Sequence, residues 1–460
     1  IRCEHLDTCE HTLAIAPARR CDRSNPVTRE SGARLSHPRS TTRALDVPTH
    51  APDNAFVPKA TAEQSPKFEE LIERLERIVV RLESTDLPLE EAIAAYQDGV
   101  LRAISEMLPA DSPRPFSIIC ATSAGAVNAT VLAANAGNFR QGVRLLMTVW
   151  KNFHVHHVYR ADPAGVFRNS SAWVVALLTG GLGRQTPFSL LDNSPLARLI
   201  GTQLDFGGIQ RSIDSGALDA FSITCSGYTS GQSVTFYQGA PGLEPWQRAR
   251  RIGISVTIGP DHLLASSALP FIFPPVRINR EYFGDGSMRQ IAPVSPALHL
   301  GADRLFVIGV GRQLETQQER VSADAVPSLA QVAGHCLNSI FLDSLEVDLE
   351  RLQRINRTLS IIPRELLEKN NMPLHQADFR VLSPSASLAE IALDHTHTLP
   401  RTIRALLFTL GALKKSGSNL VSYLLFEKAF CRALIKLGYE DTMKRRDDLM
   451  QFLGFEACWL

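Results

Sequence analysis

The sequence lacks any apolar run of about 18 or more residues, which excludes a typical membrane-spanning helix. It also lacks an apolar segment behind a basic start, so we expect no signal peptide. There is little charge of either sign in excess, because the formal net charge is +1. No global field therefore favours nucleic acid or an anionic membrane, and such a partner must meet a local patch. The first residue is Ile1 rather than Met, which suggests a fragment or a misassigned start.

Paired cysteines and metal-ligand spacings are also missing. The eight cysteines are scattered and contain no Cys-x-x-Cys pair, which excludes a zinc ribbon and a disulfide framework. This usage favours a reducing compartment, so we expect a cytoplasmic protein. His154, His156 and His157 have no carboxylate or cysteine nearby at ligand spacing, so we expect no metal site. No glycine-rich phosphate-binding loop occurs, and we expect no cofactor.

The N-terminal third changes character at residue 68. Residues 1–66 are rich in Pro, Ser, Thr and Arg without any period, and we expect a disordered tail there. Residues 68–82 carry apolar side chains at three- and four-residue steps, which predicts an amphipathic helix. Pro88 suits the first turn of a second helix, which we expect to run from about residue 89 to 108. The two helices together predict a helical hairpin.

From Phe116 onward the pattern becomes α/β. Short apolar runs predict strands, and an alanine-rich stretch predicts a helix at residues 126–136. The expected strands are residues 117–120, 221–225, 233–237, 280–283 and 305–310. Helical patterns dominate from residue 328 to the end. We therefore expect an α/β fold followed by a helical C-terminal extension.

The clearest chemical signal surrounds Ser123. In Cys120-Ala121-Thr122-Ser123-Ala124-Gly125-Ala126 a strand runs into a tight turn with a serine at its tip, and a helix leaves. This is the pattern of a nucleophile elbow, in which small residues such as Ala121 and Gly125 relieve crowding. The amide of Ala124 would then be a donor to a developing oxyanion. The same residues also fit a serine that merely caps the helix, because Ala121 stands where a glycine is usual.

A second signal is Gly284-Asp285-Gly286-Ser287 after the strand expected at residues 280–283. A serine is a poor nucleophile without a base, and Asp285 on a glycine-flanked turn could approach it closely. Taken alone, Asp-Gly is also a common turn without any chemical role.

Together these motifs resemble the patatin-like phospholipases. The likeness includes Thr122–Ala126, Asp285-Gly286-Ser287 and further motifs between about residues 96 and 311: Ala265-Ser266-Ser267-Ala268-Leu269-Pro270, Phe273-Pro274-Pro275 and Pro293-Val294-Ser295-Pro296. The resemblance implies a parallel-rich sheet flanked by helices and hydrolysis of glycerolipid or phospholipid acyl esters without a metal. It implies Ser123 as nucleophile, Asp285 as base, and Ala121, Gly125 and Gly286 as supports of the turns. A peripheral membrane contact is also implied.

The chain departs from this family's pattern upstream of the elbow. Members begin with a strand and a glycine-rich loop that supplies much of the oxyanion hole. Here Leu89-Glu90-Glu91-Ala92-Ile93-Ala94 stands in that place. We therefore expect a domain without its first strand, an open sheet edge beside residues 117–120, and weak hydrolysis.

Residues 68–100 resemble a different family, the small subunit of exodeoxyribonuclease VII. That family is a helical hairpin without catalytic residues that binds a nuclease large subunit. The alternative function is therefore that of a non-catalytic subunit, without direct nucleic-acid binding. The expected domains are a tail (1–66), the hairpin (67–100), the hydrolase domain (96–311) and the helical extension (312–460).

One basic segment falls outside both resemblances. Arg248, Arg250 and Arg251 follow Trp246 closely. Such a group could contact phosphate or lipid headgroups, and it could equally be a solvated cationic turn.

Overall fold

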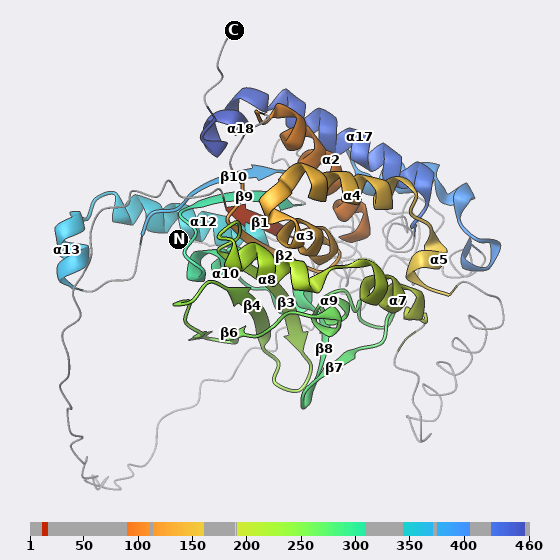
Figure 1. Cartoon of the computed structure of the whole chain (residues 1–460), viewed down its shortest axis with the longest axis horizontal. Helices are drawn as coiled ribbons and strands as arrows, with labels where there is room; N and C mark the ends of the chain where they lie inside the picture. The colour runs from red at the N-terminus through yellow and green to blue at the C-terminus, as the bar shows by residue number, and fades with distance from the viewer. Residues whose placement is uncertain are drawn as a thin grey trace, which may run out of the picture. The chain divides into compact units, whose positions relative to one another are not determined.

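The computed structural model describes residues 12–16, 90–109, 114–160, 189, 191–309, 344–370, 375–404 and 425–455. These residues build a mixed α/β fold, in which helices flank a central 10-stranded sheet (Figure 1). The expected α/β class is confirmed. The first helix of the expected hairpin, residues 68–82, lies outside the described residues. Within the described part, no helix combines the length and the apolar character needed to cross a bilayer.

The sheet has the strand order β10-β9-β1-β2-β3-β4-β6-β5, with β8 also paired to β3 and β7 paired to β8. The strands are β1 (Thr12–Ala16), β2 (Ile118–Thr122), β3 (Ala220–Gly227), β4 (Ser233–Gly239), β5 (Trp246–Arg248), β6 (Arg251–Ser255), β7 (Val276–Ile278), β8 (Glu281–Asp285), β9 (Arg304–Gly309) and β10 (Asp378–Leu382). The pairs β2–β3, β4–β6 and β9–β10 are parallel and the others are antiparallel. The sheet is thus more mixed than the resemblance implied, because short turns join β3 to β4, β5 to β6 and β7 to β8.

Helices cover the sheet, and two of them follow the sequence patterns closely. The helix expected at about residues 89–108 is α2 (Glu90–Met107), and the alanine-rich one is α3 (Gly125–Ala134). The others are α4 (Phe139–Lys151), α5 (Val155–Val158), α7 (Ser194–Gln203), α8 (Phe206–Asp214), α9 (Pro260–Ser266), α10 (Ser295–His299), α12 (Ser344–Leu359), α13 (Arg364–Lys369), α14 (Leu388–Asp394), α17 (Lys428–Lys444) and α18 (Arg446–Leu453). Short 3-10 turns are η1 (Ala136–Asn138), η2 (Gly286–Arg289) and η3 (Thr396–Thr398).

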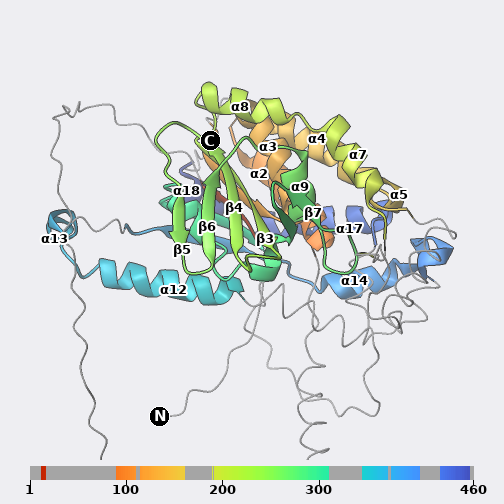
Figure 2. The same ribbon diagram turned by 90° about the horizontal axis from the view of Figure 1, so that it is seen from below.

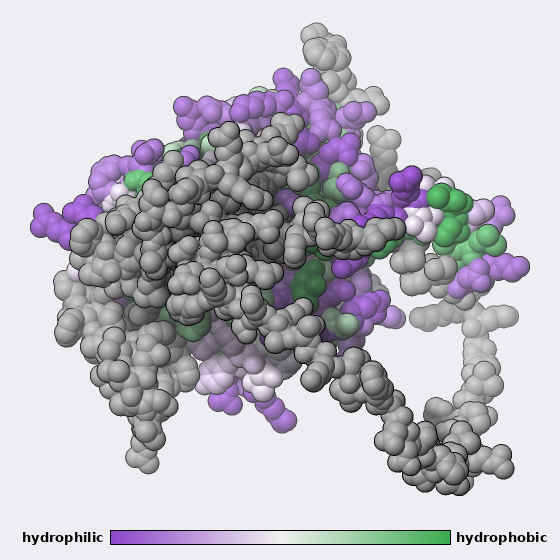
Figure 3. Space-filling view, turned by 180° about the vertical axis from the view of Figure 1, so that it is seen from behind, coloured by the Kyte–Doolittle hydropathy of each residue, from purple (hydrophilic) through white to green (hydrophobic). Residues whose placement is uncertain are grey.

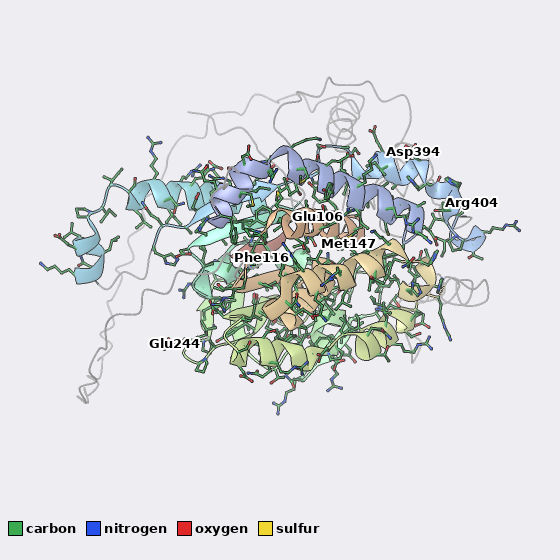
Figure 4. All side chains as sticks on the ribbon, turned by 45° about the horizontal axis from the view of Figure 1, so that its top comes forward. Glu106, Phe116, Met147, Glu244, Asp394 and Arg404 are labelled. Carbon is green, nitrogen blue, oxygen red and sulfur yellow. The ribbon has the colours of Figure 1, made fainter. Side chains whose placement is uncertain are left out.

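Helix α2 is held by an unusually close crossing with α17 (Figure 1). A Cβ atom added to Gly99 would lie 2.1 Å from the carbonyl oxygen of Ile435, and one added to Gly438 would lie 2.1 Å from that of Tyr96. The two glycines therefore let the helix backbones touch, which no larger residue allows. Hydrogen bonds across the crossing join Tyr96 to Asp441 and Tyr439 to Glu106, which is labelled in Figure 4.

The place beside β2 is occupied, which corrects two expectations. Residues 12–16, expected within a disordered tail, form β1, and this strand pairs antiparallel with both β2 and β9. Ala14 lies opposite Cys120 on one side and Val307 on the other. The sheet is therefore not open beside β2. The alternation in Thr12–Ala16 extends over only five residues, too few to be distinguished from irregular chain without its partners.

The C-terminal part is not wholly helical, contrary to expectation. Asp378–Leu382 forms β10, which pairs in parallel with β9 at the edge of the sheet. The segment is five residues long, and its strand character depends on β9, which lies far away in the sequence.

Asp98 is a buried carboxyl group on α2. Its side chain is fully buried, and among the described residues neither carboxyl oxygen has a hydrogen-bond partner. Burial raises the pKa of the Asp98 carboxyl well above its usual value, and the charges of Lys151 and Arg102 oppose this shift. The folded state therefore holds a proton that the unfolded state releases, so this group destabilises the fold progressively as pH rises above about 4.

We predict that Asp98→Asn stabilises the protein at neutral pH. The free energy of unfolding should rise by at least about 1.4 kcal/mol at pH 8, the equivalent of one pKa unit, because Asn is neutral in the buried site without binding a proton. The gain should disappear below about pH 4, where the carboxyl is protonated in both states. Urea unfolding at both pH values measures it, with Asp447→Asn, an exposed carboxylate on α18, as the control. An unchanged or lower stability at pH 8 would contradict the prediction.

Candidate active site

Ser123 stands on a strained turn between β2 and α3. The strand ends at Thr122, the helix begins at Gly125, and Ser123 between them has a φ of 54°. A positive φ is uncommon for a residue with a side chain and marks strain that surrounding structure must hold. Ala121 is buried, as the elbow pattern requires of a small residue. The strand–turn–helix geometry is thus present around Ser123, rather than an ordinary helix cap, since the residue before α3 is Ala124 and the Ser123 hydroxyl bonds to Asp285.

Asp285 meets Ser123 directly. The Ser123 hydroxyl donates a hydrogen bond of 2.5 Å to Oδ2 of Asp285. Asp285 ends β8. Its backbone position is fixed by pairing with Cys225 on β3 and by a hydrogen bond that its amide donates to the Ala268 carbonyl. Its second carboxyl oxygen, Oδ1, accepts from the Ser287 amide at 2.9 Å. The structure therefore brings together the two residues that the sequence singled out separately.

Gly286 explains why Asp285 can approach so closely. A Cβ atom at Gly286 would lie 2.1 Å from the carbonyl oxygen of Thr224 on β3. Backbone lies in the way, so any side chain would push the turn after β8 away from the sheet. The Asp-Gly pair is thus required by the close passage of one backbone over another, a reason that the sequence alone does not reveal.

Two serines at the C-terminal end of α9, its last residue Ser266 and the following Ser267, hold the elbow in place. The Ser123 amide donates to Oγ of Ser266 at 2.9 Å, and Ser266 Oγ donates to the Thr224 carbonyl at 2.7 Å. Ser267 Oγ donates to the Ser123 carbonyl at 3.2 Å. Ser266 and Ser267 were noticed in the sequence only as part of a family-like motif, without a role. Their role depends on a contact across the fold, which no local pattern signals.

Ala124, whose amide is the expected oxyanion donor, directly follows Ser123. Among the described residues this amide makes no hydrogen bond, and Ala124 is in the helical conformation at the start of α3. The upstream segment that replaces the family's glycine-rich loop is helical from Glu90. Of the expected site residues, Ser123, Ala124, Gly125 and Asp285 lie at one end of β2 and β3.

A buried network of side-chain amides lies behind the elbow, and no sequence motif predicts it. The side-chain amide of Gln97 on α2 donates to the Ile308 carbonyl, and the Asn128 amide of α3 donates to Gln97 Oε1 and to the Ala94 carbonyl. Trp150 completes the network with a 2.7 Å bond to Asn128. Gln97 also lies against Gly125, 3.4 Å from where its Cβ would be. This network fixes α2 to the first turn of α3.

The groups beside Asp285 are neutral at ordinary pH. Burial raises the pKa of the Cys225 thiol well above its usual value, and the charge of Asp285 adds to the shift. Burial also raises the pKa of the Tyr228 hydroxyl, with Asp285 again contributing. Neither group therefore supplies an ionised base beside Ser123 at neutral pH.

The histidines gather without forming a metal centre. His154 Nδ1 lies 2.9 Å from Oε2 of Glu427, and the rings of His154, His156 and His157 lie close together. In the described part of the chain, no group of three or more His, Cys, Asp or Glu residues is placed to hold a metal ion.

We predict that Ser266→Ala impairs turnover without unfolding the protein. The change removes the acceptor of the buried Ser123 amide and should loosen the strained turn, lowering kcat for a short-chain ester about 10-fold, equivalent to about 1.4 kcal/mol. Ser233→Ala, which alters a buried serine of β4, is the matched control. Circular dichroism and steady-state kinetics measure both variants, and a wild-type kcat in Ser266→Ala would refute the bracing role.

Comparison with known proteins finds two matched ranges, which overlap. Residues 92–298 match the family model of the patatin-like phospholipases, and residues 68–103 match that of the exonuclease VII small subunit. The chain is 54% identical over 39 residues to the exodeoxyribonuclease 7 small subunit of Edwardsiella ictaluri, covering 8% of this chain and 49% of that protein. It is 61% identical over 33 residues to that of Enterococcus faecalis, covering 7% and 43%. The chain thus spans about half the length of the curated relatives it matches, and it contains a patatin-like phospholipase domain at residues 92–298.

Proposed function

We propose that this chain hydrolyses lipid acyl esters with Ser123 as nucleophile and Asp285 as base. The observation that carries the proposal is the 2.5 Å hydrogen bond between the two side chains, at a strained elbow inside a patatin-like phospholipase domain. Both side chains are buried, so their interaction is little screened by water. The domain supports a lipid hydrolase in general, and the dyad gives that activity a specific mechanism.

The chemistry follows from the positions of these groups. Ser123 Oγ attacks the ester carbonyl while its proton passes to Asp285, and the carbonyl oxygen becomes an oxyanion facing the Ala124 amide. Collapse of the tetrahedral intermediate expels the lipid alcohol, which takes the proton from Asp285. A water molecule then gives a proton to Asp285 and attacks the acyl-serine. The fatty acid is released as Ser123 Oγ leaves and takes that proton back from Asp285.

A second function is suggested by the match at residues 68–103: binding a nuclease large subunit as the small subunits of exodeoxyribonuclease 7 do. This second function is disfavoured because the second half of that segment is buried. Ile93, Tyr96 and Val100 are at most 1% exposed, because α2 is packed against α17, α3 and α4. A partner would have to displace these helices to reach the apolar face, so we rank the hydrolase first.

We predict that hydrolysis of p-nitrophenyl butyrate depends on both dyad residues. Ser123→Ala removes the nucleophile and Asp285→Asn removes the base, so each should lower kcat/KM to the level of an uncatalysed blank. Asp261→Asn, in the first turn of α9, is the control for a lost carboxylate. Activity in Asp285→Asn at the wild-type level would exclude the Asp285 assignment.

We also predict slow hydrolysis. Removal of one oxyanion donor typically lowers turnover about 10² to 10³-fold, and the segment before Ala95 provides no glycine-rich loop. The rate should therefore lie at least ~10²-fold below that of a relative with this loop. A rate within about 10-fold would mean that other amides supply the donors.

Finally, we predict no stable complex with an exodeoxyribonuclease VII large subunit. Co-expression and affinity purification should recover the chain alone, and single-strand DNA degradation should not be restored. Gly99→Leu, which forces α2 and α17 apart, tests whether release of the apolar face of α2 permits binding. Co-purification of the wild-type chain with restored nuclease activity would reverse the ranking of the two functions.

A further inference from the structure

The turn between β5 and β6 concentrates positive charge at one edge of the sheet. Arg248 ends β5, Arg251 begins β6, and Arg250 between them has a φ of 57° in the tight turn. Arg248 and Arg250 are exposed, and Arg251 is half-buried. The turn is well fixed, because the Arg250 carbonyl accepts from the Ser233 amide of β4 at 2.9 Å. We call Arg248, Arg250 and Arg251 the arginine turn.

Among the residues that the structure describes, the neighbouring charges do not neutralise the arginine turn. Two charged residues of α12, Asp348 and Arg351, contribute to the pKa of Arg251 through their charges. They also form an ion pair with each other at 3.4 Å. Asp348 Oδ2 is further engaged by the Val294 amide. The five side chains carry four positive charges and one negative, a net of +3 within one small surface. His299 on α10 adds no charge, because burial and the nearby arginines lower its pKa to about 4.

Strand register places the arginine turn at the same end of the sheet as the dyad. Arg251 pairs with Ser233, and Ser233 pairs with Ser226 at the carboxyl end of β3. That end of β3 is also where Thr224 pairs with Thr122, the residue before Ser123. Figure 2 shows β3, β4, β6 and β5 side by side. Three strand spacings separate β2 from β6, which corresponds to about 14 Å.

Three exposed aromatic side chains belong to the chain segments around the dyad at this end of the sheet. Tyr228 is 45% exposed at the end of β3, and its amide bonds to the carbonyl of Tyr282, which is 50% exposed on β8. Phe271 is 63% exposed and has a φ of 66° in the loop whose Ala268 bonds to Asp285. A bulky residue held in such a conformation is uncommon and often functional.

We infer that this edge of the sheet docks onto an anionic lipid bilayer, with the arginine turn on the headgroups and Tyr228, Tyr282 and Phe271 in the interfacial layer. Cationic side chains favour anionic lipid surfaces, and aromatic side chains favour the headgroup region. The spacing of about 14 Å is too long for the turn to hold the phosphate of the lipid whose ester is at Ser123, so the turn contacts neighbouring lipids. The use of this docking, bringing Ser123 to lipid esters, rests on the proposed function, whereas the binding to the bilayer does not.

The test is sedimentation with vesicles of phosphatidylcholine containing 30% phosphatidylglycerol, against vesicles of pure phosphatidylcholine. Wild type should bind the anionic vesicles, and high salt should release it. Arg248→Ala with Arg250→Ala should bind about 30-fold more weakly, since each basic residue near such a surface contributes about a factor of five to ten. Turnover of a short-chain ester in solution should be unchanged in this double variant.

Two controls locate the surface. Arg144→Ala with Arg432→Ala removes two exposed arginines from α4 and α17 and should leave vesicle binding unchanged. Ile361→Ser with Leu366→Ser removes the exposed apolar residues of the α12–α13 corner, part of the hydrophobic surface seen in Figure 3, and should also have no effect.

Equal binding by wild type and the arginine-turn variant would overturn the inference, as would equal binding to both vesicle types. Loss of binding only in the α12–α13 variant would assign docking to that corner and equally refute the arginine turn. Repeating the measurement with Ser123→Ala separates docking from catalysis. If vesicle binding depends on the turn while wild type hydrolyses no ester, the docking surface stands and the hydrolase proposal fails.

Discussion

The closeness of Asp285 to Ser123 depends on the absence of a side chain at Gly286. The backbone after Asp285 passes so near Thr224 that a Cβ atom would lie 2.1 Å from a carbonyl oxygen. This passage places the carboxyl group at the tip of the elbow, where its Oδ2 accepts a 2.5 Å hydrogen bond from the Ser123 hydroxyl. The strain at Ser123 is offset from the other side, by the bonds from its backbone to Ser266 and Ser267. The site is thus the meeting point of three loops, each held by backbone contacts to β3 or to its neighbours.

Helix α2 links this site to the C-terminal part of the chain. On one side the Gln97–Asn128 network binds it to α3, directly behind the elbow. On the other, Gly99 and Gly438 let it cross α17 with backbones in contact. The helix lies where the two family matches overlap, at residues 92–103. A segment that matches the exonuclease VII small subunit is here buried within its own fold, and within the described part of the chain the buried Asp98 carboxyl has no hydrogen-bond partner.

The sequence predicted those parts of the fold whose patterns are local and long. Helix α2 was expected within a residue of each observed end, and the strands β2, β3, β4 and β9 were expected with shifts of one or two residues. Short strands that depend on distant partners were not predicted. Both β1 and β10 have five residues, and each exists through pairing with β9. The same reason explains the site: Ser123 and Asp285 have signatures of their own, whereas Ser266, Gln97 and the tight passage at Gly286 act only through contacts across the fold.

The central claim is that Ser123 is an activated nucleophile, and covalent labelling tests it most directly. The purified chain is treated with a fluorophosphonate probe, digested, and mapped by mass spectrometry, alongside Ser123→Ala and Ser266→Ala. The account predicts a single adduct on the peptide containing Ser123, no adduct in Ser123→Ala, and slower labelling in Ser266→Ala, where the elbow has lost its brace. Equal labelling of wild type and Ser123→Ala, or an adduct on another serine, would contradict it.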